Sequence, residues 1–240
     1  MIKNVNIENE TKVSSIINSK EKVDLTFYCR DNIPRYQTIS SIPKNHIEYF
    51  KSILPINMES MFCDCRYLFG VNLSGIDTSL NISMKNMFKN CNYIFYNGCI
   101  DLHMLITDNI LSTESMFEVM NSGPEVINLS NWNLIKNKSM KRMFYNCSKL
   151  IDLNMENIDT KGCEDFSEMF YNCRKLISIN TTLDFSSCIN VKGMFRYSGL
   201  KNLHLKNVPR SLLDIHNEFI DFTGGTLNET YIIDNILEDK

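Results

Sequence analysis

The dipeptide Met-Phe recurs at six places in the chain, and its spacing constrains the fold more than any other feature. The copies begin at residues 61, 87, 116, 143, 169 and 194, so successive steps are 26, 29, 27, 26 and 25 residues. A near-constant period between about 20 and 50 residues is typical of solenoids and other repeat arrays. The repeat is therefore the unit from which most of this chain is built.

Each Met-Phe pair belongs to a longer pattern of apolar residues. In the clearest copy the pattern is Met140-x-x-Met143-Phe144-x-x-Cys147, and it recurs over residues 58–65, 84–91 and 166–173. Apolar residues at positions i, i+3, i+4 and i+7 lie on one face of an α-helix. This part of each repeat is therefore predicted to form a short helix.

The last position of the pattern forms a cysteine column. The third repeat has Met120 there and the last repeat has Ser198, so the column accepts small or flexible residues; its cysteines are Cys65, Cys91, Cys147 and Cys173. Free cysteine behaves as a small apolar residue when it is buried. The chain has nine cysteines, an odd number, and no Cys-x-x-Cys pair, which is a poor basis for a disulfide framework or a zinc site. The column is predicted to be buried, reduced and free of metal.

The second half of each repeat reads as a strand followed by a turn. Leu150, Leu153, Met155 and Ile158 are the template, and alternation at the second and third positions is typical of a half-buried strand. Asp159-Thr160 follows the template, as Asp77-Thr78 does in an earlier repeat, and short polar side chains of this kind favour turns. Trp132 takes the apolar position that Ile158 holds, so it is predicted to lie in the core.

Together these elements predict an α/β repeat fold. No single unit can bury its apolar face alone, so neighbouring units must stack. The expected architecture is a leucine-rich-repeat-like right-handed solenoid, with a parallel sheet on one face and short helices on the other.

The complete pattern, Met-x-x-Met-Phe-x-x-Cys-x-x-Leu-x-x-Leu-x-Leu-x-x-Ile-Asp-Thr, resembles the repeat of about 26 residues found in the BspA-like family of bacterial surface proteins. The resemblance covers about residues 58–208, and the unit from 143 to 168 matches best. It implies a relative of leucine-rich repeats, and it implies surface display, adhesion and protein binding.

The flanking segments lack the repeat and define the predicted organisation: 1–57, the solenoid over 58–208 with six Met-Phe units, and 209–240. The first segment is either an N-terminal cap or a docking segment for a larger assembly. After Gly224-Gly225, the residues Leu227, Tyr231, Ile232 and Leu237 predict a short amphipathic helix. That helix is interpreted as a C-terminal cap, with partner docking as the alternative.

No pattern of catalytic or cofactor-binding residues stands out. The four histidines, His46, His103, His204 and His216, are scattered, and there is no phosphate loop, HExxH motif or dinucleotide fingerprint. A net charge of −3 is unlike the strongly basic surface that nucleic-acid binding needs. The sequence therefore predicts a protein that is not an enzyme, with no catalytic residue, cofactor, metal or nucleic-acid partner.

What remains is a row of polar residues on the outward side of the predicted sheet, which we call the sheet-face ladder. Its members lie between the second and third apolar columns: Asn72, Asp101, Asn128, Asn154, Asn180 and His204. Solenoids use such extended faces for binding. An outer face in contact with water also needs polar residues, so binding and simple solvation are both open at this stage.

Two classes of function follow. The first is a non-enzymatic binding or recognition module of leucine-rich-repeat type, such as an adhesion protein, with a protein or host-surface partner. The alternative is a structural or decoration component of a phage or viral particle. Three features keep it open: the lack of an apolar signal region, the unassigned first 57 residues, and a composition of 30 Asn, 28 Ile and no Ala, which AT-rich genomes favour. The N-terminus has no apolar signal region, and no apolar run is long enough to insert in a membrane. The expected location is cytoplasmic or virion-associated rather than the cell surface.

Overall fold

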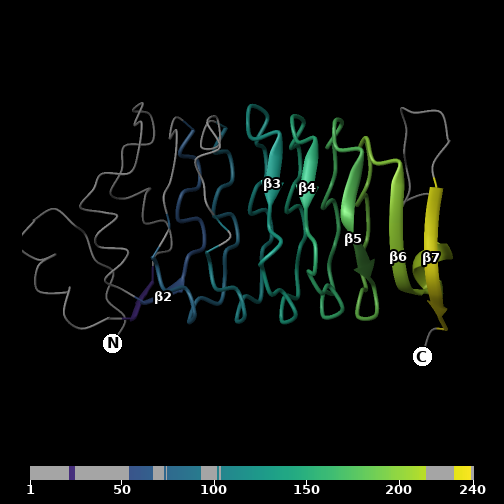
Figure 1. Ribbon diagram of the computed structural model, residues 1–240, viewed down its shortest axis with the longest axis horizontal. Coiled ribbons are helices and arrows are strands. Elements are labelled where there is room, and N and C mark those ends of the chain that lie inside the picture. The colour runs from purple at the N-terminus through teal and green to yellow at the C-terminus, as the bar shows by residue number, and fades with distance from the viewer. Residues whose placement is uncertain are drawn as a thin grey trace, which may run out of the picture.

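The computed structural model describes residues 22–24, 54–66, 73, 75–92, 102, 104–214 and 230–238. Over these residues the chain winds into coils that stack along the long axis of the molecule (Figure 1). Most of the first 57 residues, for which a cap or docking segment is predicted, lie outside this part of the chain, as do Cys29, Cys99, His46, His103 and His216. The boundaries at 57 and 208 stay a prediction.

The strands of successive coils form a parallel five-stranded sheet. Its order follows the chain, β3 (Val126–Asn128), β4 (Asp152–Asn154), β5 (Ser178–Asp184), β6 (Asn202–Pro209) and β7 (Thr230–Leu237). Each pair of neighbours is parallel. A second, two-stranded parallel sheet pairs β1 (Lys22–Asp24) with β2 (Leu54–Asn57). The predicted parallel sheet is confirmed, and the fold is a β-solenoid.

A second line of contacts joins the coils before the Met-Phe segments. Single parallel bridges run from coil to coil through equivalent residues: Ser83, Ser112, Ser139, Asp165 and Asn190. The coils are therefore held in register at two separate places along their length.

The prediction of short helices in the Met-Phe segments is wrong. Within Met140–Cys147 the backbone makes consecutive turns, in which the amides of Met143, Tyr145 and Cys147 each donate to the carbonyl three residues earlier. The amides of Met140, Arg142, Phe144 and Asn146 donate to carbonyl oxygens of the next coil; Phe144 N–H, for example, lies 3.0 Å from the Met169 carbonyl oxygen. In the described residues the one helix is α4 (Arg210–Asp214), and no helix is long and apolar enough to span a bilayer.

Left-handed residues explain why these segments turn rather than form helices. Arg142 and Asn146 have φ of 54° and 59°, and equivalent pairs recur four residues apart in the other coils. A left-handed residue at every fourth position is incompatible with a right-handed α-helix. Two successive four-residue turns place the side chains at positions i, i+3, i+4 and i+7 in the core. This is the same apolar spacing that a helix produces.

The core consists of stacked columns that run the length of the solenoid. The six phenylalanines of the Met-Phe pairs are buried, and adjacent rings lie nearly parallel with centroids 5.3–5.8 Å apart: Phe62, Phe88, Phe117, Phe144, Phe170 and Phe195. Trp132 is buried as predicted, and its indole N–H donates to the Leu102 carbonyl oxygen at 3.0 Å. The strands and the Met-Phe turns thus share one hydrophobic core.

The prediction of a C-terminal amphipathic helix is also wrong. Residues Tyr231, Ile232 and Leu237 belong to β7, which pairs in parallel with β6 over its whole length, while Leu227 lies outside the described residues. Tyr231 lies opposite Leu203 and Ile233 opposite Leu205, so this segment continues the solenoid register. Pairing with an existing strand outweighs the local helical pattern, because it satisfies the backbone and continues the sheet.

Candidate functional site

The structure brings three members of the sheet-face ladder together. Asn128 on β3 lies directly opposite Asn154 on β4, and the Asn180 side-chain amide donates to the Asn154 Oδ1 at 2.6 Å. Asn128 and Asn180 are exposed, and Asn154 is half-buried. Asn72 and Asp101 lie outside the described residues. A continuous row of amides therefore crosses three strands.

These amides are tied into the backbone of the sheet. Asn128 Oδ1 accepts the Ser130 amide and Asn154 Oδ1 accepts the Glu156 amide, both at 3.0 Å. Asn180 Oδ1 accepts the Met155 amide of the preceding coil at 2.7 Å. Because these oxygens are held by neighbouring groups, the amides are positioned in advance rather than left to rotate.

His204, the last member of the predicted ladder, does not lie directly opposite Asn180. The pairing of β5 with β6 shifts between Ser178 and Thr182, so that Thr182 rather than Asn180 lies opposite His204. A β-bulge of this kind adds residues to one strand and re-aims the side chains beyond it. The ladder therefore continues from Asn180 to His204 through Thr182.

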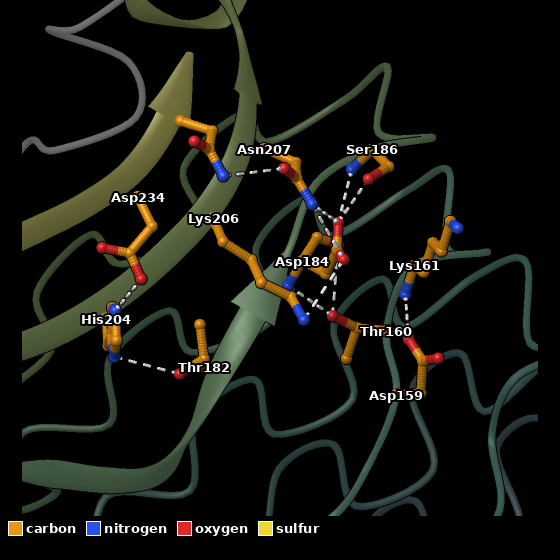
Figure 2. A network of polar contacts seen from close by, with 11 residues as sticks. Asp159, Thr160, Lys161, Thr182, Asp184, Ser186, His204, Lys206, Asn207 and Asp234 are labelled. Carbon is orange, nitrogen blue, oxygen red and sulfur yellow. Dashed lines mark hydrogen bonds and ion pairs between the residues drawn. The ribbon is translucent and has the colours of Figure 1, made fainter. Parts of the chain in front are cut away.

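A network of polar contacts lies at this point, on β5, β6 and β7 (Figure 2). His204 bridges the three strands: its Nδ1 lies 3.0 Å from the Thr182 hydroxyl and its Nε2 lies 2.5 Å from Asp234 Oδ2. Nε2 must carry a proton to donate to the carboxylate, whereas Nδ1 can donate to or accept from the threonine hydroxyl. His204 thus ties the last strand to the sheet.

Asp184 is the buried centre of the same network. Its side chain is 6 % exposed, and its Oδ1 accepts the Ser186 hydroxyl at 2.6 Å and the Ser186 amide at 2.9 Å. The Asn207 amide lies 3.1 Å from both carboxylate oxygens, and Lys206 Nζ lies 3.4 Å from Oδ2. Burial alone would raise the pKa of Asp184, but these donors and the lysine together lower it. The carboxylate is therefore ionised at neutral pH.

A surface pocket of about 310 Å³ adjoins the network. It is lined by residues 157–160 after β4, by Thr181, Thr182 and Asp184 on β5, and by Lys206 on β6. The lining is mostly hydroxyl, carboxylate and ammonium groups, so the pocket suits a polar group better than an apolar one.

Sequence reasoning missed Asp184, although a signal was present. Asp184 lies 25 residues after Asp159, which is one repeat, and both accept the amide two residues later, from Ser186 and Lys161. Asp77 makes the same bond to Ser79, so the predicted aspartate turns are confirmed. The recurrence of aspartate at this position of the repeat predicts the turn, but the pairing of Asp184 with Lys206 depends on the neighbouring coil.

Asp184→Asn should lower the free energy of unfolding at neutral pH by about 1–3 kcal/mol, the usual cost of disrupting a buried polar group. The NH2 group of the new amide would face the donors of Ser186 and Asn207, and the ionic attraction to Lys206 would be lost. Because the pKa of Asp184 is lower in the folded state, ionisation stabilises the fold above the unfolded pKa, and this is lost as pH falls through the folded value. Urea titrations at pH 7 and pH 3 should therefore give a smaller difference at pH 3. A difference that does not change with pH would contradict this account.

The cysteine column is buried as predicted. Cys65, Cys91, Cys147 and Cys173 are at most 3 % exposed, and no disulfide joins any of the seven described cysteines. Cys147 Sγ lies 3.1 Å from the Phe117 carbonyl oxygen of the preceding coil, and Cys173 Sγ lies 3.0 Å from that of Phe144. Burial raises the pKa of Cys147 to about 12. In the described part of the chain no group of three or more His, Cys, Asp or Glu could hold a metal ion.

Cys147 and Cys173 should therefore resist thiol reagents at pH 8 in the native protein and react rapidly in urea. The thiolate is the reactive form, and burial disfavours it in both cases. Mass-spectrometric mapping after brief alkylation measures each site separately. Labelling of either residue under native conditions at the rate seen in urea would show that the column is open to solvent.

The geometry defines a class, a parallel β-solenoid repeat protein with a polar outer sheet face. The chain matches the family described as Mycoplasma protein of unknown function, DUF285, over residues 35–149 and 101–208. These matches span well over half of the chain, so the protein belongs to this family. None of the curated proteins and none of the solved structures is significantly similar to it.

Proposed function

We propose that the protein is a non-enzymatic binding module that contacts a protein or host-surface partner through its sheet face. The observation that carries the proposal is the row of amides from Asn128 through Asn154 to Asn180, held in register across three strands. Amides held in fixed positions lose little side-chain entropy on binding, which favours their use in recognition.

The chemistry of the face favours a polar, hydrogen-bonding partner. Asp152, Glu156 and Ser178 flank the row and are exposed, and the pocket beside Lys206 adds a polar recess. Little basic charge lies on this face, which disfavours a phosphate backbone. The resemblance to BspA-like repeats supports binding or adhesion; incorporation into a particle stays the alternative, without an observation of its own.

A triple variant tests the proposal, with Asn128, Asn154 and Asn180 each replaced by Lys. Three long cations on the row should abolish capture of the partner from an extract of the source cells, measured by quantitative pull-down against the unmodified chain. The matched control adds three lysines at exposed positions elsewhere, by replacing Ile135, Ser187 and Ile189.

The expected result is that the control captures the same proteins as the unmodified chain and the row variant does not. Circular dichroism shows whether both variants are folded. If the folded row variant captures the same proteins, while deletion of residues 1–57 abolishes capture, the sheet face is not the binding surface.

A further inference from the structure

A row of tyrosines crosses the Met-Phe turns of three successive coils, outside the sheet-face ladder. Tyr145 and Tyr171 stack with ring centroids 4.8 Å apart and planes 12° apart, and Tyr197 meets Tyr171 edge to face at 5.3 Å. The Asn146 amide donates to the Tyr171 carbonyl oxygen at 2.8 Å, which keeps these coils in register. All three tyrosines are half-buried, so one edge of the row faces solvent.

Basic side chains follow the tyrosines in the same coils. Lys149, Arg174 and Lys175 are exposed, and none of them forms an ion pair within the described residues. Lys149 and Lys175 each lie six residues after the methionine of their Met-Phe pair, so they occupy equivalent places in adjacent coils. Two carboxylates near the row are paired with Arg142, whose Nε lies 3.3 Å from Glu168 Oε2 and whose guanidinium also lies 3.3 Å from Glu118 Oε1. The strip is therefore locally positive on a chain with a net charge of −3.

The arrangement of the rings shows which groups are free to bind. One face of Tyr145 is covered by Tyr171, and the Arg142 guanidinium carbon lies 4.0 Å from the Tyr145 centroid. Nucleic-acid bases bind single rings by stacking on open faces. The hydroxyls of Tyr145, Tyr171 and Tyr197 make no hydrogen bond to any described residue. The strip therefore presents phenol, ammonium and guanidinium donors, which match carboxylates.

From this complementarity we propose that the tyrosine–basic strip, formed by Tyr145, Tyr171, Tyr197, Lys149, Arg174 and Lys175, is a second interaction surface that binds an acidic segment of a protein partner. The strip goes beyond the proposed function, because it uses the turns rather than the sheet face. Binding there does not depend on the asparagine row.

The test measures binding of a fluorescein-labelled glutamate-rich peptide to the full chain by fluorescence anisotropy at low salt. Replacing Arg174 and Lys175 with Gln should raise the Kd about tenfold or more, equivalent to about 1.4 kcal/mol. The control replaces Lys136 and Lys161, two exposed lysines outside the strip, with Gln, and so removes the same amount of charge. It should change the Kd less than about twofold. Equal losses in both variants would overturn the proposal, because attraction by overall charge would then explain the binding.

A second variant separates the hydroxyls from the rings. Replacing Tyr145 and Tyr171 with Phe keeps the stack and should raise the Kd for the peptide about threefold. An oligo-dT strand serves as the competing probe and should bind more weakly than the peptide. If oligo-dT binds more tightly than the peptide, and loses affinity in the Arg174 and Lys175 variant, the strip is a nucleic-acid surface and the proposal is wrong.

Discussion

Phe144→Ala is expected to lower the free energy of unfolding by about 3–5 kcal/mol, the range measured when a core aromatic residue is truncated. Phe144 is completely buried and stacks on both Phe117 and Phe170, at centroid distances of 5.5 and 5.6 Å. The substitution therefore leaves a cavity between coils on both sides. Denaturant titration followed by circular dichroism measures the change.

The matched control is Ile189→Ala, another truncation of a large apolar side chain. Ile189 is 76 % exposed, so its removal should change the free energy of unfolding by no more than about 0.5 kcal/mol. Equal costs for the two variants would show that the Phe column does not hold the coils together.

Gly199→Ala is expected to cost about 1–3 kcal/mol or more, as overpacking does. A Cβ at this position would lie 2.3 Å from the Arg174 carbonyl oxygen, and the Gly199 amide already donates to the Cys173 carbonyl oxygen at 3.0 Å. The clash is with the backbone of the adjacent coil, which cannot move without disturbing the hydrogen bonds between coils. Thermal and urea unfolding both report the loss.

Gly193→Ala separates the clash from backbone strain. Gly193 has φ of +63°, but a Cβ there would meet only the Glu168 Cγ at 3.6 Å, an ordinary contact. Its cost should be about 1–2 kcal/mol, the strain of a left-handed residue alone. A larger cost at Gly193 than at Gly199 would contradict the close approach of the coils.

The stacking of repeats could be derived from residue types alone. The Met-Phe period and the alternation around Leu153 identify the side chains that must be buried. Because each repeat stacks on similar repeats, the pattern within one repeat is enough to predict which of its side chains are buried. The buried cysteine column, the parallel sheet and the Asp77 and Asp159 turns follow from the same pattern. The outward placement of Asn128, Asn154 and Asn180 follows from strand alternation.

Only the tertiary structure decided the backbone of the Met-Phe segments and the contacts beyond Asn180. Apolar spacing is the same in a helix and in two tandem turns, and the choice depends on left-handed residues such as Asn146, whose amides bond to the next coil. The bulge before Thr182, the burial of Asp184 beside Lys206 and the strand at β7 depend on the neighbouring coil. The apolar pattern of one repeat specifies which side chains point inward. Register and hydrogen-bond partners depend on the contacts between neighbouring repeats, and the repeats of this chain differ in length.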